Sequence, residues 1–179
     1  MKILLILFCS CVLFSFHEIG IEKRVENNEY EVKAAFIYNF TKFIEWEGEN
    51  LKSSSSFKVC IFKNSPIESY LKEILKDKKI NGKKTEISTV DNIENINDTH
   101  ILFIPGNISA KEFKTCIAKS KLKNTLIVSE KAGRIEIGSC INFLVVANKV
   151  KFEVNLSSLK KNKLKASSQL LKLAERIEE

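Results

Sequence analysis

Histidine, the side chain most often used in acid–base catalysis, is scarce in this chain. Its two histidines are His17, beside an apolar N-terminus, and His100, at the start of an apolar run. A Ser–His–Asp hydrolase would have to use His100, and the chain has no G-x-S-x-G turn to present a serine. It also has no G-x-G-x-x-G or P-loop sequence for holding phosphates. The sequence therefore predicts no catalytic residues, and we expect a structural role for His100.

The cysteines could bind a metal or form disulfides. Cys60, Cys116 and Cys140 are those that remain beyond the apolar N-terminus. They form no C-x-x-C pair and no Cys/His spacing of the kind found in metal sites, so we expect neither a metal nor a cofactor. Cys60 and Cys116 lie in apolar segments, which favours buried free thiols. Export would permit a disulfide, but an odd count leaves at least one thiol unpaired.

One segment could bind a ligand through its backbone. Pro105, Gly106 and Asn107 follow the apolar run HILFI (100–104) and precede a helix start at Ser109. In a parallel sheet this turn would lie at the carboxyl edge, where ligands bind. Helix N–H groups there would be available to an anion. The same pattern also fits an ordinary strand-to-helix turn, which is its more common meaning.

The segment YEVKAAFIYNFTKFIEW, residues 30–46, has the periodicity of a helix with one broad apolar face. Asn39 falls within that face, and Trp46 lies at its end. A buried amide without hydrogen-bond partners costs free energy. We therefore predict that Asn39 is a satisfied buried group that ties the helix to backbone elsewhere, with direct ligand contact as the alternative. Trp46 is expected to be structural.

The N-terminus predicts export. Lys2 is followed by a run of apolar and small residues that ends at Phe16, which is the layout of a signal peptide. This run is shorter than the roughly 20 residues of a membrane-spanning helix. An uncleaved anchor and a lipoprotein site at Cys11 are the alternatives. We assign residues 1–16 to the signal peptide, 17–29 to a flexible lead-in and 30–179 to a single domain.

Beyond residue 56, strand and helix patterns alternate. Strands are predicted over 57–62, 85–90, 100–104 and 125–129, and helices over about 67–76 and 109–120. Each helix starts with a capping box, Ser65 to Glu68 and Ser109 to Glu112. After Gly133 the segments 134–137, 140–147 and 150–156 are too close together for intervening helices, so we expect an antiparallel extension with a turn at Asn148 and Lys149. Two short helices should follow, from Ser157 or Ser158 and from Ser167.

These patterns together predict an α/β fold. It is a three-layer sandwich with a mostly parallel, Rossmann-like sheet and an antiparallel C-terminal hairpin. The chain carries a net charge of +7. Removal of residues 1–16 takes away only Lys2 and leaves 28 basic against 22 acidic residues. The lysines are spread along the chain, whereas a nucleic-acid site needs concentrated charge and stacking aromatics, so we expect no nucleic-acid partner.

Two blocks of this sequence resemble the YfiR family of periplasmic proteins. Residues 30–46 are similar to the family pattern V-K-A-A-F-L-Y-N-F-x-K-F-x-x-W-P. Residues 141–174, INFLVVANKVKFEVNLSSLKKNKLKASSQLLKLA, are similar to its ending, where I-N-F precedes R-V-x-F-E-I-N-L and L-x-I-S-S-x-L-L-x-L-A. Glu47 replaces a proline and Lys149 an arginine. Thr99 stands where some members carry a cysteine, so no disulfide is carried over.

The resemblance implies a non-enzymatic periplasmic regulator. Such a protein binds and represses the periplasmic sensor part of an inner-membrane signalling protein, best known as a diguanylate cyclase, and so controls cyclic-di-GMP and biofilm formation. An outer-membrane lipoprotein is the second implied partner, and a homodimer stays open. The alternative is a periplasmic small-ligand receptor that feeds a membrane histidine kinase, with its pocket near Pro105, Gly106 and Asn107.

The expected partner surface is the last hairpin and the helix after it. The candidate partner-binding residues are Phe143, Lys151, Phe152, Glu153 and Asn155, and Asn142 beside them is expected to be structural. On an alternating strand Phe152 points away from Lys151, Glu153 and Asn155, so the set cannot form one contact. Core packing is an equal alternative for Phe143 and Phe152.

Overall fold

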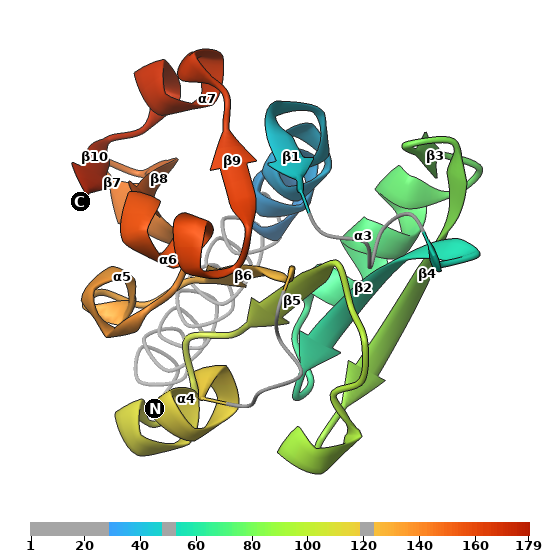
Figure 1. Cartoon of the computed structure of the whole chain (residues 1–179). Coiled ribbons are helices and arrows are strands. Elements are labelled where there is room, and N and C mark those ends of the chain that lie inside the picture. Colours follow the sequence, from blue (N-terminus) through green and yellow to red (C-terminus); the bar gives the residue numbers. More distant parts are fainter. Residues whose placement is uncertain (1–28, 48–52, 119–123) are drawn as a thin grey trace, which may run out of the picture.

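The structure, a computed structural model, describes residues 29–47, 53–118 and 124–179 (Figure 1). The predicted signal peptide and all but the last residue of the predicted lead-in lie outside these residues. None of the described helices is both long and apolar enough to cross a bilayer.

An eight-stranded sheet forms the centre of the molecule, with the strand order β10-β8-β7-β6-β5-β2-β4-β3. The five strands from β4 to β7 in that order are parallel. β8 runs antiparallel to β7, β10 is parallel to β8, and β3 is antiparallel to β4. The predicted α/β architecture, a mostly parallel sheet with an antiparallel C-terminal hairpin, is confirmed. The bounds are Ser56–Phe62 (β2), Lys79–Ile80 (β3), Lys83–Val90 (β4), Ile101–Ile104 (β5), Leu126–Ser129 (β6), Ile141–Val146 (β7), Lys149–Asn155 (β8) and Arg176–Glu178 (β10).

The burial of each strand depends on its place in the sheet. Every residue of β5 and β6 is buried, because these strands lie in the middle and helices cover both of their faces. β4 alternates between half-buried and exposed residues over most of its length, as expected near an edge. Between β4 and β5, Ile93–Asn95 form a 3₁₀ turn that is capped by the Asn92 side chain.

Helices cover the two faces of the sheet (Figure 1). Residues 29–43 form the N-terminal helix, which packs on β7 and β8 through Phe36 and Phe40. The connection from β2 through α3 to β4 and the connection from β5 through α4 to β6 run in opposite directions along the sheet. Because such crossovers are right-handed, α3 and α4 lie on opposite faces. α4, α5 and α6 line a groove on the face opposite the N-terminal helix. The bounds are Ile67–Leu75 (α3), Ala110–Ile117 (α4), Arg134–Ile137 (α5), Leu156–Lys161 (α6) and Ser168–Leu173 (α7).

The prediction that residues 44–46 continue the N-terminal helix is wrong. Ile44–Trp46 form a strand, β1, which pairs antiparallel with Leu164–Ala166 (β9) in a separate two-stranded sheet. Lys163 and Glu47 extend the pairing, since the Glu47 N–H donates to the Lys163 carbonyl at 3.1 Å. The helical periodicity of the segment does not distinguish its last turn from a short strand. The C-terminal partner strand supplies the hydrogen bonds that favour the extended form.

The prediction of a strand over residues 134–137 is also wrong. Arg134–Ile137 form one helical turn, α5, between Gly133 and Gly138, whose φ angles are 80° and 124°. Glycine adopts such angles without the steric cost that a side chain brings. The two glycines therefore turn the backbone sharply at both ends of a segment too short to join the sheet.

Two local predictions need smaller corrections. The hairpin turn between β7 and β8 consists of Ala147 and Asn148, both at positive φ, so Lys149 already belongs to β8. The capping box at Ser65 does not form, because Pro66 is the cap residue and Glu68 pairs with Lys72 instead. At α4 the Ser109 hydroxyl does accept the N–H of Glu112, as predicted.

Candidate functional site

Phe143 and Phe152 lie in the core. They face each other across β7 and β8, and both rings contact Phe36 and Phe40 of the N-terminal helix at centroid distances of 5.1–6.1 Å. Both side chains are essentially inaccessible. Their role in this structure is to hold the N-terminal helix on the C-terminal hairpin, and a partner cannot reach them without unpacking that helix.

Glu153 is also buried, within a polar network on the other face of the hairpin. Its Oε1 accepts a hydrogen bond from Asn142 Nδ2 at 2.9 Å, and its Oε2 lies 3.2 Å from Arg176 Nε on β10. Asn142 Oδ1 in turn accepts from the Ser129 hydroxyl at 2.7 Å and from the Lys131 N–H at 3.1 Å. The network links three adjacent strands, β6, β7 and β8, to the last strand, β10. Asn142 is therefore buried, with both its amide oxygen and its amide nitrogen hydrogen-bonded.

Asn155 completes the set of buried candidates. Its amide nitrogen donates to the Ile135 carbonyl of α5 at 3.0 Å, and its amide oxygen caps α6 by accepting from the Ser158 N–H at 2.7 Å. A side chain with both ends occupied in this way positions two helices. The expectation that Phe143, Phe152, Glu153 and Asn155 form a partner surface is therefore corrected: all four are buried.

Lys151 is the one member of the predicted set at the surface, where it pairs with Glu175 at 3.3 Å. Exposed apolar side chains surround this part of the molecule. In the described part of the chain, the large hydrophobic residues with exposed side chains are Val145 (53%), Val146 (41%), Leu173 (62%) and Ile177 (43%). They belong to β7, α7 and β10, which lie on one side of the molecule with β8 (Figure 1). We call these four residues and Lys151 the C-terminal patch.

The predicted ligand turn lies at a second site. Pro105, Gly106 and Asn107 line a cavity of about 380 Å³ at the carboxyl edge of the sheet. The turn after β2 and the first turn of the N-terminal helix form its other walls. The cavity is thus built from segments that are far apart in sequence, as is typical of the carboxyl edge of doubly wound sheets.

A buried ion pair forms one wall of this carboxyl-edge cavity. Lys33 Nζ lies 2.7 Å from Glu130 Oε2, and it also bonds to Glu29 one helical turn earlier. Glu130 Oε1 accepts the N–H of Gly106 at 3.1 Å and the hydroxyl of Tyr30 at 3.4 Å. The protein's own carboxylate thus occupies the Gly106 N–H that we expected an external anion to use. Glu29, Lys33 and Glu130 together leave one negative charge, which disfavours an anion here.

Asn39 and Trp46 lie in different environments. The prediction of a buried Asn39 is wrong, since its side chain is exposed and accepts a hydrogen bond from Lys42 at 3.1 Å. Residues two positions apart on a helix point in nearly opposite directions, so the burial of Ile37 turns Asn39 outward. Trp46 is buried, with its ring centroid 5.4 Å from that of Phe57, and its Nε1 has no hydrogen-bond partner among the described residues.

Sequence reasoning missed Lys33, Glu130 and the exposed valines. Lys33 sits between Val32 and Ala34 on a mostly apolar helix, and Glu130 directly follows a strand at the carboxyl edge. A charge on an apolar face and an acid after a buried strand would together have suggested the pair. Within the described ranges, no group of three or more His, Cys, Asp or Glu side chains is arranged to hold a metal ion.

Comparisons with known proteins agree with the resemblance noted in the sequence. A search of curated proteins finds no significant match. The sequence profile of the YfiR/HmsC-like family matches residues 30–175, a range that begins in the N-terminal helix and ends just before β10. This range includes the aromatic contact between that helix and the hairpin, the carboxyl-edge cavity and most of the C-terminal patch. The match spans most of the sequence, and the chain therefore belongs to the YfiR/HmsC-like family.

Proposed function

We propose that this protein is a periplasmic, non-enzymatic regulator that binds and represses the periplasmic sensor part of an inner-membrane signalling protein, a diguanylate cyclase. Membership of the YfiR/HmsC-like family supports this proposal. The output would be a change in cyclic-di-GMP and hence in biofilm formation. An outer-membrane lipoprotein that competes for the regulator is part of the same proposal.

The observation that carries the proposal is the C-terminal patch. Large apolar side chains that stay exposed on one side of a domain often mark a protein-binding surface. Here such residues are confined, within the described part of the chain, to β7, α7 and β10. Lys149 pairs with Val146 across the hairpin, Lys172 precedes Leu173, and Lys151 is paired with Glu175, so charged side chains lie at the margin of the patch. We therefore assign the sensor domain to this surface rather than to the buried residues of the hairpin.

A binding experiment tests this assignment. The periplasmic sensor domain of a diguanylate cyclase from the same organism would be immobilised, and binding of the regulator measured by surface plasmon resonance. Val146→Asp and Leu173→Asp should each weaken binding by about tenfold or more, because a desolvated charge would replace an apolar contact. Ala110→Asp is the matched control, since it adds the same charge to an exposed position on α4, which lies at the opposite end of the molecule from α7 (Figure 1).

The outcomes separate clearly. Loss of binding in both patch variants, with normal melting temperatures and an unaffected control, supports the surface. Equal binding by all three variants would reject the patch. Failure of the wild-type protein to bind the sensor domain would reject the proposed partner.

A second candidate function rests on the carboxyl-edge cavity. Its volume of about 380 Å³ lies within the range of small-molecule sites. We infer that a protein using this cavity would be a small-ligand receptor that signals to a membrane histidine kinase. The ligand should carry a positive or hydrogen-bond-donating group, because the wall contributes one excess negative charge. A thermal-shift screen of metabolites, with Asn107→Trp to block the mouth, tests this function.

A further inference from the structure

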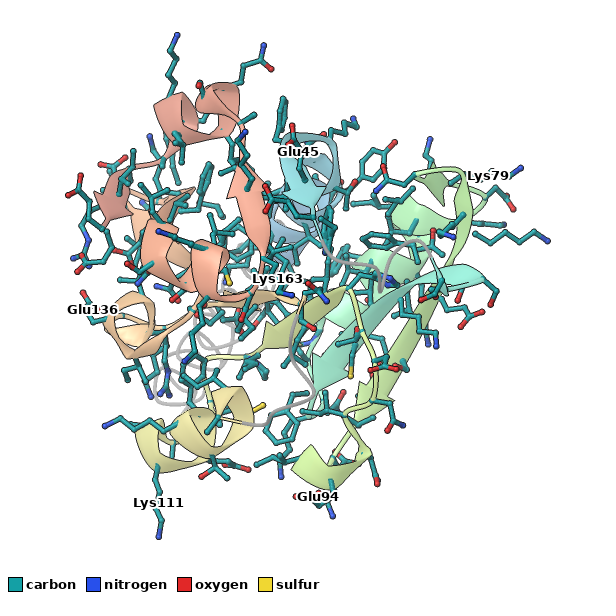
Figure 2. All side chains as sticks on the ribbon, in the orientation of Figure 1. Glu45, Lys79, Glu94, Lys111, Glu136 and Lys163 are labelled. Atoms are coloured by element: carbon teal, nitrogen blue, oxygen red, sulfur yellow. The ribbon has the colours of Figure 1, made fainter. Side chains whose placement is uncertain are left out.

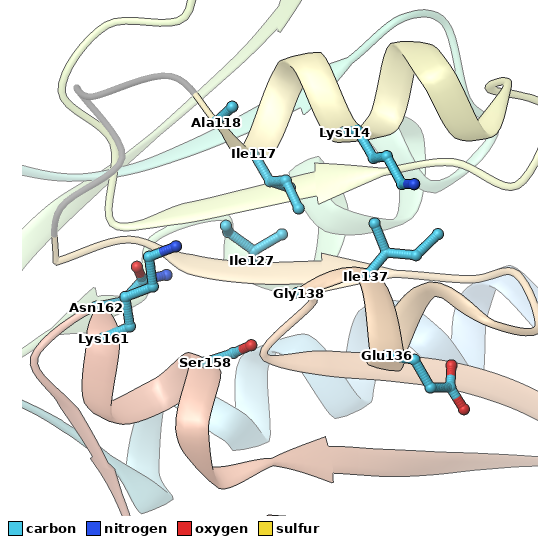
Figure 3. Close-up of a pocket in the computed structure, with 10 residues that line it drawn as sticks. All are labelled: Lys114, Ile117, Ala118, Ile127, Glu136, Ile137, Gly138, Ser158, Lys161 and Asn162. Carbon is cyan, nitrogen blue, oxygen red and sulfur yellow. The ribbon is translucent and has the colours of Figure 1, made fainter.

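A groove lies on the opposite side of the sheet from the N-terminal helix. Unlike the carboxyl-edge cavity, it is lined by apolar and basic side chains. It lies between α4, α5 and α6 and has a volume of about 430 Å³ (Figure 3). Ile127 of β6 forms its floor, and Ile117 and Ile137 form apolar walls. Ile127 is only 3% exposed at the bottom of the groove, whereas Ile117 and Ile137 are half-buried. An apolar molecule in the groove would therefore contact mainly these two walls.

The charge at the rim is positive. Lys114 of α4 and Lys161 of α6 line the groove, and neither forms a salt bridge with any carboxylate of the described residues. Glu136 is the acidic residue in the lining, and it shares the single charge of Arg176 with Glu153 and Glu178. Its negative charge is therefore only partly compensated, and the positive charge of the rim comes from Lys114 and Lys161. The two lysines are left to attract an anion from solution.

A buried arginine adds to this positive field. Arg134, in the first turn of α5, donates to the Ile108 carbonyl, and its guanidinium lies 4.5 Å from the centre of the Phe113 ring of α4. Its side chain is buried, and no described carboxylate forms a salt bridge with it. A buried cation without a counter-charge at the α4–α5 junction raises the electrostatic potential beside the groove.

Gly138 keeps the groove open. A Cβ atom at this position would lie 3.0 Å from Ile117 Cδ1, and the φ angle of 124° is one that side chains rarely adopt. A larger residue would therefore fill the space between α4 and α5 as well as strain the turn. The glycine at residue 138 thus lets the end of α5 approach Ile117 closely and leaves the space beside it free.

From these observations we propose that the groove binds a small amphipathic carboxylate. Its hydrocarbon part would lie on Ile127 between Ile117 and Ile137, and its carboxylate would accept hydrogen bonds from Lys114 or Lys161. The Ser158 hydroxyl, at the lower wall of the groove, is a further donor (Figure 3). The site is separate from the carboxyl-edge cavity and goes beyond the proposed binding of a sensor domain.

The lysines have a competing structural explanation, which the test must separate from binding. Lys114 and Lys161 lie in the last turns of α4 and α6, where cations stabilise a helix through its dipole. That explanation predicts a change in stability and no effect on ligand binding. A ligand site instead predicts weaker ligand binding and no change in stability.

The test uses octanoate as the probe and the purified protein with labelled isoleucine methyl groups. Octanoate below its micelle concentration should shift the methyl signals of Ile117, Ile127 and Ile137. Octylamine, which has the same chain and the opposite charge, should not. The double variant Lys114→Gln/Lys161→Gln should weaken octanoate binding by about tenfold, the effect of losing charge-assisted hydrogen bonds.

The matched control is Lys111→Gln/Lys160→Gln, which removes the same charge from the same two helices outside the groove lining. Lys111 extends away from the molecule (Figure 2). This variant should bind octanoate within about twofold of the wild type, because its lysines act only through the screened long-range field. Absence of octanoate binding, shifts centred on other residues, or equal weakening in both double variants would overturn the proposal.

Discussion

Lys33 and Glu130 are 97 residues apart in sequence, yet their side chains form a salt bridge of 2.7 Å in which each is only 5% exposed. The pair joins the N-terminal helix to the carboxyl end of β6. Glu130 also accepts a hydrogen bond from the N–H of Gly106, which follows β5. A Cβ at residue 106 would lie 3.1 Å from the Glu130 carbonyl oxygen, so glycine permits this close approach. One ion pair thus fixes the walls of the carboxyl-edge cavity.

The first prediction concerns this ion pair. Lys33→Met should lower the free energy of unfolding by about 3 kcal/mol, because it leaves the buried Glu130 carboxylate without its cation. Urea denaturation measures the change. Lys72→Met is the control, since it removes a salt bridge of the same 2.7 Å length to Glu68 at the surface and should cost at most about 0.5 kcal/mol. Similar losses in the two variants would contradict the role of burial.

The second prediction contrasts two asparagines. Asn142→Leu should cost about 2–3 kcal/mol, because Ser129, the Lys131 N–H and Glu153 all lose a hydrogen-bond partner in a buried site. Asn39→Leu should change stability by less than about 0.5 kcal/mol, because that side chain is exposed and, among the described residues, is hydrogen-bonded only to Lys42. Thermal unfolding of the two variants compares them directly. A larger effect at Asn39 than at Asn142 would contradict the arrangement of both residues.

The third prediction separates packing from partner binding in the hairpin. Phe152→Ala should destabilise the protein by about 3–5 kcal/mol, since it leaves a cavity beneath the N-terminal helix. Lys151→Ala, one residue earlier, should cost less than about 1 kcal/mol, because its pairing with Glu175 is at the surface. Chemical denaturation checks both values. If Phe152→Ala were as stable as the wild type but no longer bound the partner protein, Phe152 would belong to the binding surface.

The fourth prediction is a pH dependence. Burial raises the pKa of the Cys140 thiol to about 11 from its ordinary value of 9.0. As pH rises above 9, the unfolded chain therefore loses this proton before the folded protein does. The thiol's contribution to the free energy of unfolding is complete below pH 9 and is lost between pH 9 and about 11. Denaturation curves across this range measure the slope.

Cys140→Ala supplies the comparison for that slope. The variant should be less stable than the wild type below pH 9 because it leaves a cavity, and its stability should decline less steeply above pH 9. Lysine and tyrosine titrations are common to both proteins and cancel in the difference. Parallel curves for the two proteins would show that burial does not shift the pKa of the thiol.

Local sequence patterns specify the order and type of most elements. Apolar runs such as ILFI and LIVS can be stable only with both faces covered, so a parallel central sheet is their direct consequence. The same reasoning puts the turn at Pro105 to Asn107 at the carboxyl edge, and it does line a cavity there. The two blocks that resemble the YfiR family are likewise recognisable without any structure.

Features that depend on a partner distant in sequence arise only when the chain folds. Ile44–Trp46 become a strand because Leu164–Ala166 are available to pair with them. Glu153 is buried rather than displayed because Arg176 of β10 covers it, and β10 itself forms only beside β8. Periodicity reports which side of an element is apolar, but it cannot say whether a polar residue will meet solvent or a buried counter-charge. The charge of Lys33, on an apolar helix face, is compensated only when folding brings Glu130 beside it.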